Sequence, residues 1–300
     1  MKILALFVAL VLERMATHLF HWRELRWLDP LLDVFLVRSR SLSGVTPYLW
    51  VLLALAVAVA PVVIIRLLLD EAWLGLPYFV LSAAVLFLCL GPEDIGEEVD
   101  RWCAAVRSGD EEEERRNAKA LLERRFSDRI AARTDVAGAV FAQANNRIFA
   151  VIFWFILLGP IGAWLFRVSD LARRRALFQA KRMAESEDVA ADCEQRADDV
   201  HAVLAWLPAR LSALGYLFAG NYDEGRAAWH NLETGDSLAR HNERLLSEVG
   251  FAALNLTRSE DEPEADWAIR AARCSKNLAL RTLWFWLVGV AVLTIAGVAF

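Results

Sequence analysis

The 300-residue sequence contains little cysteine and no excess of positive charge. Four cysteines are too few for a disulfide scaffold in a chain of this length. A formal net charge of −5 argues against a nucleic-acid-binding protein, which usually has a basic surface. The sequence also has no Gly-x-x-x-x-Gly-Lys loop, Gly-x-Ser-x-Gly elbow, His-Glu-x-x-His helix or Cys-x-x-Cys pair. These absences argue against several large classes of nucleotide-binding, hydrolytic and metal-dependent enzymes.

Apolar residues, in contrast, are in excess. They make up 57% of the chain, and only 24% of the residues are charged, whereas a soluble domain is about 45–50% apolar. Because a helix needs about 20 apolar residues to cross a bilayer, four uncharged runs qualify as membrane helices. They are residues 44–65, 73–92, 148–166 and 282–300. The backbone in lipid must satisfy its own hydrogen bonds, so the runs predict an all-α, polytopic integral membrane protein with helical water-facing segments.

Two other apolar runs are weaker. Residues 3–12 are too few to cross a bilayer, and Glu13 and Arg14 follow them at once. No small-residue cleavage site follows either, so we interpret this run as a retained helix rather than a signal peptide. Residues 202–220 are interrupted by Pro208 and Arg210, and an arginine at a helix centre costs about 3 kcal/mol on insertion. This run spans the membrane, lies at its surface or re-enters it.

The pattern of runs and charges predicts six consecutive segments. They are an N-terminal apolar helix with a basic segment (1–43), a transmembrane hairpin (44–92), a cytoplasmic helical segment (93–147), a region with a broken membrane helix, an amphipathic helix and a Pro-Ala-Arg-Leu segment (148–220), a helical water-facing segment (221–281) and a C-terminal transmembrane helix (282–300).

The arginines and lysines conflict with a simple topology after residue 166. Basic residues favour the cytoplasmic side, which places 93–147 inside and would place the end of 148–166 outside. Six basic residues nevertheless follow that run: Arg167, Arg173, Arg174, Arg175, Lys181 and Arg182. Either Gly159-Pro160 breaks the run into a re-entrant hairpin, or these charges snorkel or form ion pairs.

Ser108-Gly-Asp-Glu111 has the spacing of a capping box, which predicts that Ser108 caps a helix with Glu111 at its third position. A further helix is expected to open after Gly220-Asn221. No metal site is expected, because the His18 and His21 pair falls short of the three or four ligands that zinc requires. No cofactor is indicated.

The residues most suspect for function are ionisable or polar groups in apolar surroundings. We single out Glu13, Arg14 and Arg210 on this ground, together with Asn145 and Asn146, which precede a membrane run. Breaks in membrane helices expose backbone groups that can bind a polar ligand, and we expect such breaks at Gly159, Pro160 and Pro208.

Two stretches resemble a known family. Residues 153–167 read Phe-Trp-Phe-Ile-Leu-Leu-Gly-Pro-Ile-Gly-Ala-Trp-Leu-Phe-Arg, and residues 203–213 read Val-Leu-Ala-Trp-Leu-Pro-Ala-Arg-Leu-Ser-Ala. Both are similar to segments of the membrane-bound cobinamide-phosphate synthases, CobD/CbiB. The Glu13-Arg14 and His21-Trp22 pairs, the Trp-x-Pro-x-Arg-Leu stretch and the final membrane run resemble the sister family AmpE more closely. The resemblance covers nearly the whole chain.

The two branches imply different activities. The AmpE resemblance implies a bacterial inner-membrane regulator or signalling modulator of inducible β-lactamase expression. The synthase resemblance implies an enzyme that joins an aminopropanol unit to a corrin carboxylate as an amide. In the synthases an acidic Glu-Asn-x-x-Asp-Gly stretch precedes the Phe-Trp helix, and here residues 142–147 read Ala-Gln-Ala-Asn-Asn-Arg. Relative to the synthases, both acids are therefore missing at this position.

The main hypothesis is thus a non-enzymatic inner-membrane sensor that modulates β-lactamase induction and the response to β-lactam antibiotics. It binds a small anionic ligand, for instance one derived from the cell wall, without chemistry. The expected ligand-binding residues are Glu13, Arg14, Gln143, Asn145, Asn146 and Arg210. The expected partners are the lipid bilayer, this ligand and either a protein partner or a second copy in a homodimer, and no nucleic acid.

Two alternatives stay open. The first is a CobD/CbiB-like amide-forming enzyme of cobalamin biosynthesis whose acids are supplied elsewhere, with Glu93, Asp94, Glu97 and Asp100 as candidates. The second is a membrane scaffold that binds no ligand.

Overall fold

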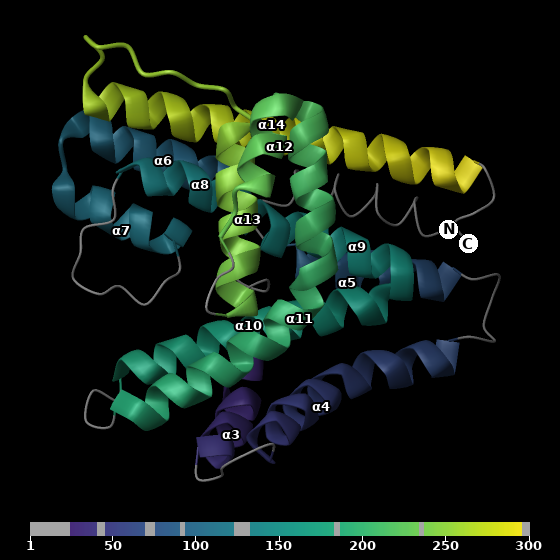
Figure 1. Ribbon diagram of the computed structural model, residues 1–300. Coiled ribbons are helices and arrows are strands. Elements are labelled where there is room, and N and C mark those ends of the chain that lie inside the picture. Colours follow the sequence, from purple (N-terminus) through teal and green to yellow (C-terminus); the bar gives the residue numbers. More distant parts are fainter. Residues whose placement is uncertain are drawn as a thin grey trace. The chain divides into compact units, whose positions relative to one another are not determined.

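The computed structural model describes residues 25–40, 46–69, 76–90, 94–122, 133–182, 187–233 and 237–295. Every regular element within these ranges is a helix (Figure 1). The described chain forms two compact units, one from the described parts of Met1–Pro92 and Ala150–Ala205 and the other from Glu93–Phe149 and Trp206–Val292. The predicted helix at 3–12, Glu13 and Arg14 lie outside the described residues.

Unit 1 consists of apolar helices packed around α10. Its elements are the 3₁₀ turn η2 (Arg26–Leu28), α3 (Asp29–Arg40), α4 (Thr46–Leu69), α5 (Leu76–Cys89), α9 (Ala150–Leu158), α10 (Pro160–Arg182) and the first part of α11 (Glu187–Ala219). Helix α10 packs against α4, α5 and α9, and α3 packs along α4 (Figure 1). The predicted runs 44–65 and 73–92 thus correspond to α4 and α5.

Unit 2 contains several amphipathic helices and a buried aromatic core. Its elements are α6 (Ile95–Ser108), α7 (Glu111–Leu122), α8 (Arg133–Ala144), the π-helix η4 (Asn145–Phe149), the rest of α11, α12 (Tyr222–His230), α13 (Leu238–Ala252) and most of α14 (Glu264–Ile295). Trp102, Phe141, Phe149 and Tyr216 are fully buried in this unit. The Tyr216 ring packs on Phe141 with ring centroids 4.7 Å apart.

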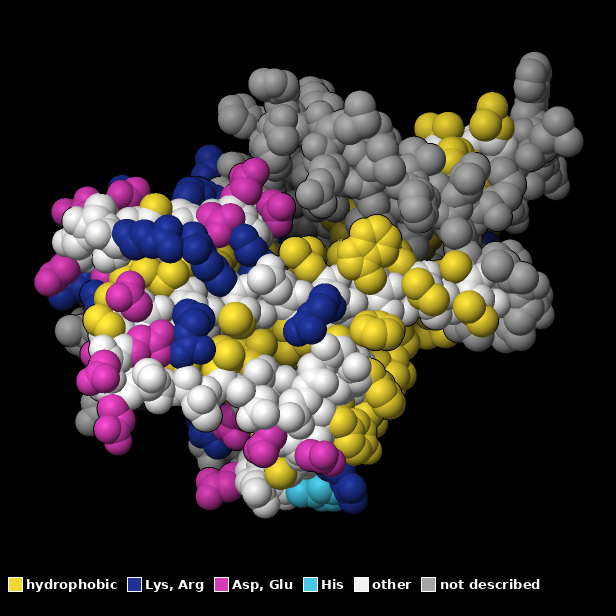
Figure 2. Space-filling model, turned by 90° about the horizontal axis from the view of Figure 1, so that it is seen from above, with side chains coloured by type: hydrophobic (Ala, Val, Ile, Leu, Met, Phe, Trp, Pro, Cys, Tyr) yellow, Lys and Arg dark blue, Asp and Glu magenta, His cyan; other side chains and the backbone are white. Residues whose placement is uncertain are grey.

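Helix α14 changes character along its length. Charged side chains gather over α6, α7 and the first part of α14, whereas hydrophobic side chains cover the second part of α14 (Figure 2). Trp284, Phe285 and Val288 are exposed there, which suits a surface in contact with lipid. The predicted boundary at 281/282, between the water-facing segment and the C-terminal membrane helix, therefore falls inside one continuous helix that runs from Glu264 through Ile295.

Three helical stretches in the described chain are long and apolar enough to cross a membrane: Thr46–Leu69, Arg133–Leu158 and Gln195–Ala219. The prediction of an all-α membrane protein is confirmed. The stretch Arg133–Leu158 also shows that the membrane run beginning at 148 continues a helical path formed by α8 and η4.

Gly159-Pro160 breaks the helical path, as predicted. Gly159 has a φ of 68°, a left-handed value that glycine adopts without strain, and α10 begins at Pro160. A Cβ atom on Gly162 would lie 2.3 Å from the Trp154 carbonyl oxygen. Glycine at 162 is therefore needed for the close approach of α9 and α10.

Pro208 does not break its helix, and that prediction is wrong. Helix α11 runs from Glu187 to Ala219 through Pro208. A proline removes the N–H that would bond the carbonyl four residues earlier, here Leu204. The indole Nε1 of Trp154 donates to that oxygen at 3.1 Å. The helix continues because a tryptophan from another helix replaces the missing donor.

Helix α4 also contains a proline, Pro61, and accepts a hydrogen bond from a tryptophan, although not at the Val57 carbonyl that Pro61 leaves without its usual donor. The indole Nε1 of Trp164 donates at 2.9 Å to the carbonyl oxygen of Ala58, which lies one turn before Pro61. Both of these indoles come from the 148–166 run, so its tryptophans support backbone carbonyls in two proline-containing helices.

The predicted capping box at Ser108 is wrong. Ser108 ends α6, and its hydroxyl donates to the Ala105 carbonyl at 3.0 Å. Gly109 then takes a φ of 71°, which terminates α6, so the cap of α7 lies two residues later than predicted. Asp110 caps α7 instead, because its Oδ1 accepts from the backbone N–H groups of Glu112 and Glu113. Asn221 caps α12 as its position indicated, accepting from the N–H of Glu224 at 3.2 Å.

The basic residues that follow residue 166 are largely paired within unit 1. Asp170 is fully buried and accepts hydrogen bonds from Arg167, Arg173 and Arg174 at 3.2, 2.8 and 2.9 Å. Arg175 forms a two-bond contact with Asp33, each at 2.6 Å. Ion pairing, one of the two explanations open for this segment, is thus observed at four of the six residues.

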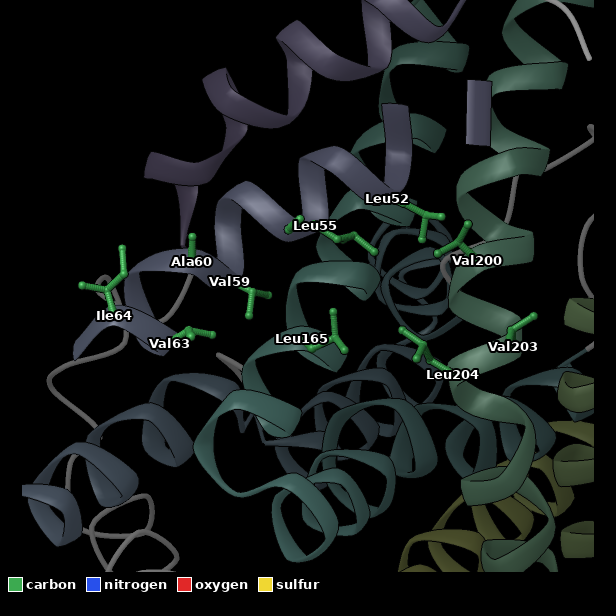
Figure 3. A pocket seen from close by; sticks show the side chains of 11 residues that line it. Leu52, Leu55, Val59, Ala60, Val63, Ile64, Leu165, Val200, Val203 and Leu204 are labelled. Carbon is green, nitrogen blue, oxygen red and sulfur yellow. The ribbon is translucent and has the colours of Figure 1, made fainter. Parts of the chain in front are cut away.

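Unit 1 also carries an apolar groove of about 700 Å³ between α4, α10 and α11. Leu52 and Val63 from α4, Leu165 from α10 and Val203 from α11 point into it (Figure 3). None of its lining side chains is polar, so the groove offers no group for acid–base chemistry.

Candidate functional site

The candidate site in unit 2 begins at the π-helix η4. Five residues, Asn145–Phe149, form this wider turn between α8 and α9. Such π turns are rare and occur often at functional sites. Helix α8 is almost entirely buried before it, and Gly138 allows it to approach Ser247 of α13 closely. Gln143, Asn145 and Arg147 are therefore buried inside the unit.

A buried ion pair forms the centre of the site. Arg147 Nη1 donates to Glu98 Oε1 of α6 at 2.8 Å, and its Nε donates to Gln143 Oε1 at 3.0 Å. Glu98 is 8% exposed and Arg147 is 4% exposed. Removing one partner of such a pair leaves the other charge buried and typically costs about 3–5 kcal/mol.

A second group of polar side chains lies in the same turn. Asn145 is fully buried, and its Oδ1 accepts from the hydroxyl of Ser212 in α11 at 3.0 Å. Its Nδ2 donates to Asn146 Oδ1 at 3.2 Å. Asn146 is partly exposed, so the turn reaches the surface at this residue. Three predicted residues, Gln143, Asn145 and Asn146, are thus brought together with α6 and α11.

Arg210 occupies a different place in unit 2. It lies on α11, donates to Asn242 Oδ1 of α13 at 2.7 Å, and stacks over Trp206 with its guanidinium carbon 4.4 Å from the ring centroid. Within the described part of the chain it has no contact with Gln143, Asn145 or Asn146. The predicted set therefore divides into a turn around η4 and a separate arginine.

None of the three predicted acids that the structure describes lies at the site. Asp94 caps α6 by accepting from the Gly96 N–H at 2.8 Å, and Asp100 pairs with Lys276 at 2.9 Å. Glu97 is exposed, and Glu93 lies outside the described residues. The carboxylate at the site belongs to Glu98, which the sequence interpretation missed.

A sequence signal for Glu98 exists. Helix α6 buries Ile95, Val99, Trp102 and Val106 along one face, and Glu98 lies in phase with them. A carboxylate on the apolar stripe of an amphipathic helix requires a buried partner. Arg147 is that partner, 49 positions along the chain.

The chemistry available at the site is narrow. One carboxylate, one guanidinium, two asparagines, one glutamine and one serine hydroxyl lie around the turn. Among the described residues no group of three or more His, Cys, Asp or Glu side chains is placed to hold a metal ion. The arrangement suits proton transfer at a carboxylate and the stabilisation of negative charge by a guanidinium.

Fold and site together define an all-helical membrane protein with a buried polar turn at a π-helix. A model of the CobD/CbiB protein family matches residues 6–281. The chain therefore belongs to the CobD/CbiB family.

Two curated relatives give the same assignment. The chain is 28% identical over 178 residues to the cobalamin biosynthesis protein CobD of Chromobacterium violaceum, covering 59% of this chain and 54% of that protein. It is 27% identical over 182 residues to the cobalamin biosynthesis protein CobD of Stutzerimonas stutzeri, covering 59% and 56%. The matches span just over half the length of these relatives. No solved structure matches the chain. The closer relation to AmpE remains a prediction.

Proposed function

We propose that the chain is an amide-forming enzyme of the CobD/CbiB type, which acts in cobalamin biosynthesis as a multi-pass protein of a bacterial inner membrane. The observation that carries the proposal is the contact between Glu98 and Arg147. The missing acids at 142–147 favoured a protein without chemistry. Helix α6 supplies a carboxylate to that stretch, which removes the main argument for that hypothesis.

The two charged groups fit the requirements of amide formation. In amide formation an amine nitrogen attacks the carbonyl carbon of a carboxyl group that has been activated as an acyl phosphate. The nitrogen loses a proton, negative charge develops on the carbonyl oxygen, and phosphate leaves as the C–N bond replaces the C–O bond. In this proposal Glu98 accepts the proton and Arg147 donates hydrogen bonds to the oxygen. Asn146 orients the substrate where the turn meets the surface, and it is held there by the buried Asn145, which Ser212 supports.

The test is complementation of a bacterial strain that lacks its cobinamide-phosphate synthase. The wild-type chain is expected to restore cobalamin-dependent growth, and Glu98→Gln to abolish it at equal membrane abundance. Asp100→Asn is the matched control, because Asp100 lies on the same helix and is half exposed. Amide formation in isolated membranes should follow the same order. Failure of the wild-type chain in both assays, at normal abundance, would overturn the proposal.

A regulatory function of the AmpE type is the second candidate. Its support is the stretch 142–147, which has Ala142 and Asn146 at the two positions where the synthases carry acids. Such a protein would bind a small anionic ligand, and the conformational change on binding would be transmitted to a protein partner or to a second copy of the chain.

Induction of a chromosomal β-lactamase tests this second function. The measurement compares deletion of the resident homologue, rescue by the wild-type chain and rescue by Asn145→Ala. Loss of induction on deletion and recovery with the wild-type chain alone would support regulation. Unchanged induction on deletion would exclude it in that host.

A further inference from the structure

Arg210 is held in one orientation by its neighbours in unit 2. Its Nη1 donates to the Trp206 carbonyl oxygen at 2.9 Å and to Asn242 Oδ1 at 2.7 Å. Asn242 is 5% exposed, so this acceptor is fixed inside the unit. The Trp206 ring covers one face of the guanidinium. These contacts restrict the side chain before any ligand arrives.

The contacts leave the charge of Arg210 uncompensated. No carboxylate lies within ion-pair distance of Arg210 in the ranges that the structure describes, and its partners there are an amide, a carbonyl and an aromatic ring. Arg210 lies inside Gln195–Ala219, one of the three candidate membrane spans. A charged residue in such a helix is costly unless it is paired or serves a ligand.

The donors that remain point to the kind of ligand. Both observed hydrogen bonds use Nη1, which leaves the edge formed by Nε and Nη2 without a partner among the described residues. This edge presents two parallel N–H groups, the geometry that binds two oxygens of one phosphate or carboxylate. The positive field also reaches His241 of α13, whose pKa is lowered by burial and, next, by Arg210.

We propose that Arg210, oriented by Asn242 and Trp206, forms a binding site for an oxyanion, a phosphate or carboxylate group, that is separate from the turn around Glu98. The anion comes either from a soluble ligand or from the headgroup of an anionic lipid. The site does not depend on amide formation, so its test is a binding measurement.

The experiment uses the full chain in nanodiscs of phosphatidylcholine, titrated with inorganic phosphate and with acetate by calorimetry. Arg210→Gln removes the charge, and Arg210→Lys keeps the charge without the two-donor edge. Arg226→Gln is the matched control, because Arg226 is an exposed arginine on α12 of the same unit. A second set of nanodiscs contains phosphatidylglycerol, and the lipid that stays with each purified variant is quantified. Melting temperatures confirm that all variants are folded.

A soluble source predicts saturable binding of an anion that weakens about tenfold or more in Arg210→Gln, less in Arg210→Lys and not in Arg226→Gln. A lipid source predicts that phosphatidylglycerol competes with the soluble anion and is retained less by Arg210→Gln than by the wild type. Equal anion binding and equal lipid retention in the wild type and in Arg210→Gln would overturn the proposal.

Discussion

Two groups of arginines, one in each unit, have different kinds of partners. In unit 1, Arg167, Arg173 and Arg174 all donate to the buried carboxylate of Asp170. In unit 2, Arg147 has one carboxylate partner and Arg210 has none among the described residues. The first arrangement ties successive turns of α10 together. The second leaves guanidinium groups next to amide and hydroxyl side chains that also suit a ligand.

The comparison shows that each arginine in apolar surroundings has to be interpreted from its own partners. The sequence places arginines beside membrane runs in both units, and position in the sequence does not distinguish a structural arginine from a ligand-binding one. The number and type of their partners in the structure distinguish them. We expect substitution in unit 1 to reduce stability, and substitution of Arg210 to reduce ligand binding with little change in stability.

The largest expected effect is that of Asp170→Asn. Removal of the buried charge leaves three guanidinium groups without their shared carboxylate, and the free energy of unfolding should fall by about 3–5 kcal/mol. Denaturant titration of the detergent-solubilised protein measures this. Asp100→Asn, which removes an exposed pair with Lys276, should cost less than about 1 kcal/mol. Equal losses in the two variants would contradict a structural role for the Asp170 cluster.

The pH dependence gives the same comparison without a mutation. Burial raises the pKa of Asp170. The positive charges of Arg174, Arg173, His201 and Arg167 together lower it by more than burial raises it, so the pKa lies below its ordinary value. A lowered pKa in the folded state stabilises the protein above the ordinary aspartate pKa of about 4, and this contribution is lost as the pH falls below it. Asp170→Asn should therefore have a shallower loss of stability in acid than the wild type.

The helices of unit 1 show what composition can predict. The uncharged run 44–65 predicts α4 to within a few residues, and Gly159-Pro160 marks the end of α9, because both follow from local chemistry. Pro208 shows the limit. Its helix continues because Trp154 bonds to Leu204, 50 positions away, and no local pattern reports that contact.

The site was half predictable for the same reason. Gln143, Asn145 and Asn146 stand out as polar residues before a membrane run, and the structure gathers them around η4. Glu98, the partner of Arg147 at this site, was not predicted, because the charges of α6 were considered without the phase of its apolar stripe. Asn242, which orients Arg210, lies on a helix that no motif connects to α11.

A smaller effect is expected at Trp154 in unit 1. Trp154→Phe leaves the Leu204 carbonyl without its indole donor and should destabilise the protein by about 1–3 kcal/mol. Pro208→Ala supplies a backbone N–H for the same oxygen, so the penalty of Trp154→Phe should shrink in that background. A double-mutant cycle measured by thermal unfolding isolates this coupling. Trp164→Phe serves as the control, because its acceptor, Ala58, lies in α4 and its penalty should not change. Independent effects of Trp154 and Pro208 would refute the replacement of one donor by the other.

The smallest expected effect is a shift in the pKa of His241, which reports directly on the uncompensated charge of Arg210. Burial and then Arg210 hold this pKa below its ordinary value, so the ring is neutral at pH 7. Arg210→Gln removes the second cause and should raise the pKa, but only part of the way, since burial remains. An NMR titration of the histidine-labelled protein measures the change, with His241→Gln to assign the resonance. Saturating anion should also raise the pKa of His241 in the wild type, because a bound negative charge offsets the guanidinium, and it should have no effect in Arg210→Gln. If the pKa of His241 is the same in the wild type and in Arg210→Gln, and the anion does not change it, then Arg210 is compensated after all. The contrast between the two units would then disappear.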